Sequence, residues 1–116
     1  MFEETAFIAF TTADLAQTKR FWVTLLGFPI VREDENYLMV DAGGVRLCFD
    51  LPNGDAHSAP GSDGVIGLKV KDLDATLAAL GSRGVGTVAG PFDDDHGKWA
   101  KLLDPDGRSV ILTESG

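Results

Sequence analysis

The sequence predicts an α+β fold made of two copies of a βαβββ unit. The first observation is a repeated segment, in which a short apolar run ends at Asp14 and again at Asp72, each followed by a Leu and a helical stretch. The second observation is a repeated glycine turn between apolar runs, at 41–44 and 104–107. Because both repeats keep the same order and a similar spacing, they indicate an internal duplication.

The first unit spans about residues 5–51. Residues 5–12 alternate in polarity and are predicted to form a strand. Asp14 is suited to cap a helix, since its carboxylate can accept a hydrogen bond from a free amide of the first turn. Apolar residues with helical spacing follow from 15 to 26, and Gly27 stands where a helix end favours a left-handed residue. Further strands are predicted at 28–32, 36–40 and 45–51.

The second unit spans about residues 65–113 and repeats this order, and residues 52–64 have the composition of a loop that joins the units. Asp72 is the matching helix cap, and its helix is expected to end near Arg83. Residues 91–97 are acidic and are predicted to form a loop. The strands are predicted at 65–70, 85–89, 99–103 and 109–113. A single domain is expected, since 116 residues are too few for two independent cores.

Composition and charge exclude several classes of protein. With 44% hydrophobic and 24% charged residues the chain is typical of a globular protein, and no apolar run approaches the ~20 residues of a membrane span. A net charge of −8 argues against nucleic acid as a partner. The acidic residues favour a cationic ligand if they line a cleft, and otherwise suit a solvated surface. We expect a cytoplasmic location, because no secretory signal is visible and the single Cys48 cannot form an internal disulfide.

Taken in order, several motifs resemble the vicinal-oxygen-chelate superfamily, which holds glyoxalases, extradiol dioxygenases and bleomycin-resistance proteins. These motifs are Asp14-Leu15, Phe21-Trp22, Leu25-Leu26-Gly27-Phe28, Val70-Lys71-Asp72-Leu73 and Asp104-Pro105-Asp106-Gly107. Together they span most of the chain. The resemblance implies that two βαβββ modules pair their sheets into an open half-barrel cleft, and that the protein forms a homodimer.

The resemblance also locates the positions from which metal enzymes of this superfamily take their ligands. One lies seven residues before each helix-capping Asp, and one lies four residues after each hairpin glycine. In this sequence these positions hold Phe7, Cys48, Val65 and Ile111. Three of these side chains have no lone pair to offer a divalent ion, and one Cys cannot hold an ion alone. His57 and His96 lie in predicted loops and do not replace such a set, so we expect no metal, no cofactor and no catalytic residue at these positions.

Alternation along the strands indicates which residues line the cleft. The hairpin repeat makes Asn36, Leu38 and Val40 equivalent to Trp99, Lys101 and Leu103. The residues predicted to bind a ligand are Phe7, Tyr37, Leu38, Arg46, Cys48, Asp50, His96, Trp99, Lys101 and Ile111. The opposite faces are nearly all apolar and are expected to pack under the two helices.

Each candidate also has an ordinary structural interpretation. An aromatic face such as Trp99 at a cleft mouth can stack on a planar ligand, while packing in a core or dimer interface is the alternative. Trp22 lies on the apolar helix stripe and is predicted to be core. Cys48 is nucleophilic only if its thiolate is stabilised, so an inert buried thiol is favoured. His96 has acid–base chemistry, but a lone loop histidine is usually a surface residue.

Three functions are consistent with these residues. The first is sequestration of a bulky aromatic or cationic compound, such as an antibiotic, which the resemblance to the bleomycin-resistance branch implies and the missing metal ligands support. The second is a metal-independent isomerase, lyase or cyclase, with acids and bases drawn from His96, Asp50, Lys101 and Arg46. The third is a regulatory or structural dimer that has kept only the fold.

Overall fold

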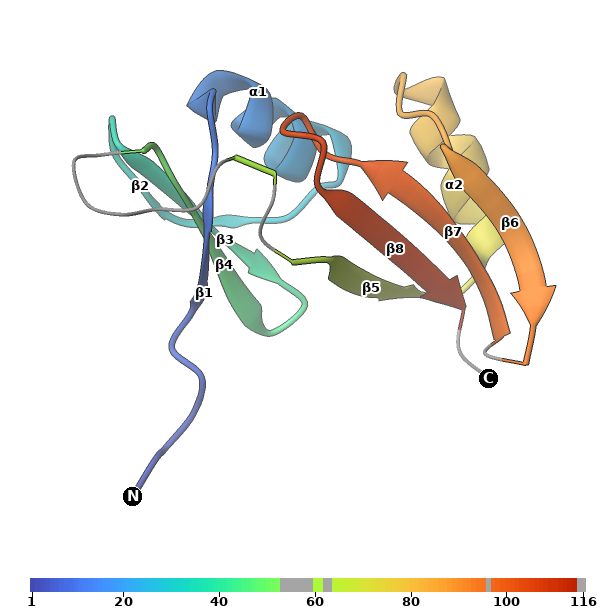
Figure 1. Ribbon diagram of the computed structural model, residues 1–116, viewed down its shortest axis with the longest axis horizontal. Coiled ribbons are helices and arrows are strands. Elements are labelled where there is room, and N and C mark those ends of the chain that lie inside the picture. The colour runs from blue at the N-terminus through green and yellow to red at the C-terminus, as the bar shows by residue number, and fades with distance from the viewer. Residues whose placement is uncertain (53–59, 62–63, 96, 115–116) are drawn as a thin grey trace.

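Each half of the chain folds into a four-stranded mixed sheet with helical structure against one face, as a computed structural model of the protein shows (Figure 1). The structure describes residues 1–52, 60–61, 64–95 and 97–114. Sheet I contains β1 (Ile8–Thr11), β2 (Ile30–Glu33), β3 (Tyr37–Ala42) and β4 (Val45–Asp50). Sheet II contains β5 (Ile66–Val70), β6 (Ala89–Asp94), β7 (Gly97–Leu103) and β8 (Ser109–Glu114).

The two sheets have the same topology. Their strand orders are β1-β4-β3-β2 and β5-β8-β7-β6. In each sheet the first strand runs parallel to the last, and the other neighbours are antiparallel. No strand pairing joins the sheets within the described residues, so they do not close into a barrel. This repetition confirms the predicted α+β fold of two βαβββ modules.

The helices begin where the sequence predicted. The Asp14 carboxylate accepts a hydrogen bond from the Gln17 amide at 3.2 Å before α1 (Leu15–Lys19), and the Asp72 carboxylate accepts one from the Ala75 amide at 3.0 Å before α2 (Leu73–Ser82). The first helix differs from a regular α-helix, because it continues as a π-helix, η1 (Arg20–Leu25). This widened turn accompanies the burial of two consecutive aromatic side chains, Phe21 and Trp22.

One hydrophobic core extends across both modules. Trp22 is fully buried, as predicted, with its ring centroid 5.2 Å from that of Phe49 and 6.1 Å from that of Phe28. On sheet II, Ala100 and Leu102 face the same core under α2. No helix in the described part of the chain is long and apolar enough to cross a membrane.

The strand predicted at 85–89 is wrong, since β6 begins only at Ala89 and takes in most of the acidic segment that was predicted to be a loop. In the register of this hairpin, Phe92 pairs with Trp99 and Asp93 pairs with Lys98. Because β6 is the edge strand of sheet II, its acidic side chains can reach solvent without entering the core.

The predicted equivalence of β3 and β7 is wrong by one residue, because the two hairpins differ in length. Ala42 pairs with Val45 across a two-residue turn, whereas the second hairpin closes three residues between the Asp104 amide and the Arg108 carbonyl. The positions equivalent to Trp99, Lys101 and Leu103 are therefore Tyr37, Met39 and Asp41. The placement of Leu38 on the cleft side was an error: it pairs with Phe49 and is 2% exposed in the core.

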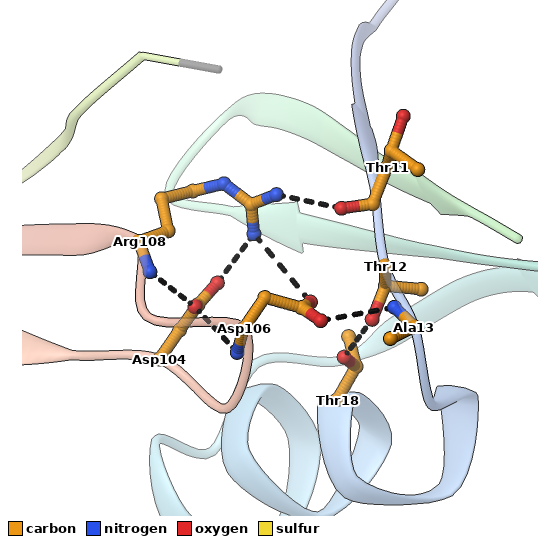
Figure 2. A network of polar contacts seen from close by, with 7 residues as sticks. All are labelled: Thr11, Thr12, Ala13, Thr18, Asp104, Asp106 and Arg108. Atoms are coloured by element: carbon orange, nitrogen blue, oxygen red, sulfur yellow. Dashed lines mark hydrogen bonds and ion pairs between the residues drawn. The ribbon is translucent and has the colours of Figure 1, made fainter. Parts of the chain in front are cut away.

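A buried arginine of the second module is inserted into the first (Figure 2). The Arg108 guanidinium donates to the Thr11 carbonyl at 2.8 Å and forms an ion pair with Asp104 on its own hairpin. It also lies over the Phe10 ring, 4.8 Å from the centroid. Asp106 adds a second link, since its carboxylate accepts a hydrogen bond from the Ala13 amide at 2.9 Å.

We expect Arg108→Met to destabilise the protein strongly. Removing the guanidinium leaves the Asp104 carboxylate buried without its counter-charge and the Thr11 carbonyl without its donor, and breaking a buried pair in this way costs about 3–5 kcal/mol. Urea unfolding followed by tryptophan fluorescence measures the loss. The matched control is Arg46→Met, at an exposed position, and equal midpoints for the two variants would show that the buried contact adds nothing.

Candidate ligand-binding site

The face of sheet II opposite α2 carries most of the side chains suited to a ligand. Strand alternation turns Ala100 and Leu102 toward α2 and turns Trp99, Lys101 and Leu103 of β7 to the other side. The strand register shows which residues of β5, β6 and β8 lie on the same side as these three, and we call this side the open face of sheet II. Its members are Phe92, Asp94, Trp99, Lys101, Leu103, Ser109, Ile111, Thr113, Gly67 and Lys69.

An aromatic pair stands on this open face. The rings of Phe92 and Trp99 have centroids 4.7 Å apart and are tilted by 47°. The Trp99 indole N–H donates to the Asp94 carboxylate at 2.9 Å, which fixes the ring orientation. Phe92 is 44% exposed and Trp99 is half-buried, so part of the aromatic surface stays available for stacking. Phe92 was missed from the sequence because the aspartates that follow it suggested a loop.

The residues around the aromatic pair leave open space above the sheet and include two lysines. Ile111 is half-buried beside Lys101, and an added Cβ on Gly67, the next residue in that row, would meet nothing within 4 Å. Lys69 and Lys101 have no ion-pair partner among the described residues. By contrast, Lys98 of β7 lies on the helix side, where its ammonium is 2.5 Å from the Asp74 carboxylate of α2.

The open face of sheet I holds another group of predicted residues. Asp50 pairs with Tyr37, and Cys48 pairs with Met39, which the sequence did not single out. Burial, together with the nearby carboxylates of Asp50 and Asp34, raises the pKa of Cys48 to about 12. The thiol lies 3.5 Å from the Asp50 carboxylate, to which it donates. Because no described group that shifts the pKa of Cys48 is basic, none of them stabilises a thiolate, and Cys48 has the chemistry of an inert thiol.

The ten predicted ligand residues thus divide between two sheets. Trp99, Lys101 and Ile111 share the open face of sheet II, and Tyr37, Arg46, Cys48 and Asp50 share that of sheet I. Phe7 precedes β1 and is 52% exposed. Leu38 is in the core, and His96 lies outside the described residues.

Three concave regions of the described chain lie elsewhere. One cavity of about 270 Å³ lies between the first helix, residues 84–88 and the second hairpin. Another of about 250 Å³ is apolar and lies between Ile8, Val45 and Leu47 of sheet I and residues 65–68. A shallower groove follows α2. None of the nine predicted residues that the structure describes lines any of these three regions, so these regions do not enclose a ligand at those residues.

The residues at the superfamily's metal-ligand positions do not fit a metal ion. Phe7, Val65 and Ile111 have no donor atom, and the thiol of Cys48 is held protonated by its raised pKa. Elsewhere in the described chain, no three His, Cys, Asp or Glu side chains are grouped to hold an ion. No step of chemistry at these positions can therefore be assigned to a bound metal.

Two modules of this topology, each with an open sheet face, are the architecture of vicinal-oxygen-chelate proteins. A sequence model of the Glyoxalase/Bleomycin resistance protein/Dioxygenase superfamily matches residues 5–112, and the chain belongs to this superfamily. Its structure is similar to that of TnmS3, an antibiotic binding protein from Streptomyces sp. CB03234, with 26% identity, a TM-score of 0.83, and coverage of 99% of this chain and 98% of that one.

Two further proteins are similar to this chain. A glyoxalase/bleomycin resistance protein from Streptomyces sp. CB03234 is 28% identical, with a TM-score of 0.75 and coverage of 96% of this chain and all of the other. An uncharacterized protein from Mycolicibacterium smegmatis is 29% identical over 110 residues, which are 94% of this chain and 91% of that protein.

We expect Cys48 to react slowly with iodoacetamide in the folded protein. A pKa of about 12 instead of 9.0 lowers the thiolate fraction at pH 8 about a thousandfold. Since a more basic thiolate is also a better nucleophile, the rate should fall by at least about tenfold rather than by the full factor. Mass spectrometry of native protein against urea-unfolded protein measures this ratio. Equal rates in the two states would contradict the burial of the thiol.

Proposed function

We propose that this protein binds a bulky aromatic small molecule, such as an antibiotic, and sequesters it without chemical change or a metal ion. The observation that carries the proposal is the Phe92–Trp99 pair on the open face of sheet II. A stacking surface set among a few polar groups is typical of a ligand site. The sequence predicted either an aromatic or a cationic ligand, and the aromatic pair supports the aromatic one.

The missing metal ligands and the raised pKa of Cys48 support binding over catalysis. The name of TnmS3, an antibiotic binding protein, supports a ligand of the same broad kind. The alternative, a metal-independent enzyme, rests on Asp50, Lys101 and Arg46, which the structure divides between two sheets.

We further propose that a second copy of the chain completes the site. Ligand sites usually bury 70–90% or more of a small molecule, and an open sheet face does not provide this alone. Ile8, Val45 and Val65 are 44%, 43% and 62% exposed around the apolar cavity, and this apolar strip beside the open faces is where a second copy would bind. Sedimentation equilibrium should therefore give about twice the chain mass of 12.3 kDa, and a monomer mass would exclude this arrangement.

Binding without chemistry is tested by following the fate of the ligand. Thermal-shift and tryptophan-fluorescence screening against glycopeptide, enediyne and aromatic antibiotics should find a compound that stabilises the protein, because a ligand that binds the folded state raises its melting temperature. Mass spectrometry of the released compound should then show it unchanged after long incubation, with or without EDTA. A ligand returned in altered form would replace sequestration with the enzyme alternative.

Substituting Trp99 should separate stacking from general stability. Trp99→Ala removes the aromatic face and should weaken binding at least about fivefold, since an aromatic pair contributes about 1 kcal/mol beyond area burial. Trp99→Phe keeps a ring but loses the hydrogen bond to Asp94, so it should bind within about twofold of the parent. Isothermal titration measures both. An alanine variant that binds as tightly as the parent would remove Trp99 from the site.

A further inference from the structure

The open face of sheet II is basic although the chain has a net charge of −8. Lys69 and Lys101 stand on this face, and they outnumber its one described acid, Asp94, which lies on the edge strand β6 and accepts a hydrogen bond from the Trp99 indole. Neighbouring acids lie on the helix side. The register places Asp93 and Glu114 beside Lys98 there, and the Glu114 carboxylate accepts a hydrogen bond from the first amide of α2 at 2.8 Å.

Both lysines lie close to the aromatic pair. Lys101 is two residues from Trp99 along the same strand face, a rise of about 7 Å. Lys69 lies in the same row as Trp99, with Thr113 between them, and two strand spacings amount to about 10 Å. A fused aromatic ring system lying over Trp99 and Ile111 therefore brings a peripheral substituent near an ammonium group.

The electrostatics of this position favour an anion. Lys101 is half-buried and, like Lys69, has no carboxylate partner among the described residues. Aromatic and apolar side chains around Lys101 exclude water on ligand binding, and a charge attraction strengthens as the local dielectric falls. A cationic ligand in the same place would meet two positive charges.

We propose that this subsite selects planar aromatic compounds bearing an acidic substituent, such as a carboxylate, a sulfonate or an ionised phenol. The ring stacks on the Phe92–Trp99 pair, and the anion lies at Lys101 with Lys69 beside it. The inference rests on the proposed function and names its ligand class. It replaces the cationic ligand that the overall acidity suggested.

A series with one ring system and three charges tests this selectivity. The probes are 9-anthracenecarboxylate, 9-anthracenemethanol and 9-(aminomethyl)anthracene, titrated calorimetrically at low salt and at 0.5 M NaCl. The carboxylate should bind about fivefold more tightly than the alcohol, as expected for one partly exposed ion pair, and the amine more weakly than either. The preference should shrink at high salt because screening weakens the ion pair.

Lysine variants locate the source of the preference. Lys101→Gln should reduce carboxylate affinity to that of the alcohol while leaving alcohol binding within twofold, and Lys69→Gln should have a smaller effect in the same direction. Lys98→Gln is the matched control, since Lys98 lies on the same strand but on the opposite face. It should leave the preference unchanged.

The outcomes distinguish this inference from the proposed function. Equal binding of all three probes, weakened together by Trp99→Ala, would overturn the charge selectivity and keep the aromatic site. A carboxylate preference that survives both lysine variants would overturn the assignment to Lys101 and Lys69. Failure of every probe to bind would overturn the aromatic subsite and the function built on it.

Discussion

The arrangement of the two modules depends on one buried guanidinium. The Arg108 side chain extends from the second hairpin into the first module and donates to the carbonyl of Thr11. Asp104, in the same hairpin as Arg108, supplies the counter-charge. A buried cation is tolerated only when its charge and donors are satisfied, so the β1 end, the Asp104–Gly107 turn and the Phe10 ring are held in one relative position. Because this contact and the shared core join the modules on their helix sides, the opposite sheet faces are left open.

Those open faces carry the polar and aromatic side chains that are suited to a ligand. The core faces have apolar partners, with Trp22 against Phe49 in the first module and Ala100 and Leu102 under α2 in the second. The faces turned away from the helices are mixed, with aromatic, basic, acidic and thiol groups. Their chemistry also differs. Sheet I carries a thiol whose pKa is raised by burial and nearby carboxylates, whereas sheet II carries, beside an aromatic pair, two lysines that form no ion pair within the described part of the chain.

Three residues distinguish this chain from the metal-dependent enzymes of its superfamily. Phe7, Val65 and Ile111 occupy positions that donate to metals in related enzymes, and they have nothing to donate. The overall acidity does not describe the open face of sheet II, because net charge sums over all surfaces and this face is only one of them. In sheet II, Asp93 and Glu114 lie on the helix side with Lys98, whereas Lys69 and Lys101 lie on the open face with Asp94.

The amino-acid sequence by itself determined the duplication, both helix starts and the burial of Trp22, because capping and helical periodicity are local and are read from consecutive residues. Only the tertiary structure decided the register of the hairpins. The second turn has one residue more than the first, so an alignment of the two turns assigns Leu38 to the wrong face; its own hairpin pairs it with Phe49 in the core, and a one-residue slip exchanges the two faces of a strand. The pairing of Phe92 with Trp99 and the insertion of Arg108 between modules were likewise beyond sequence reasoning. Strand pairing brings Phe92 beside Trp99, and packing of the two modules brings Arg108 beside Thr11. Neither proximity can be read from a pattern of consecutive residues.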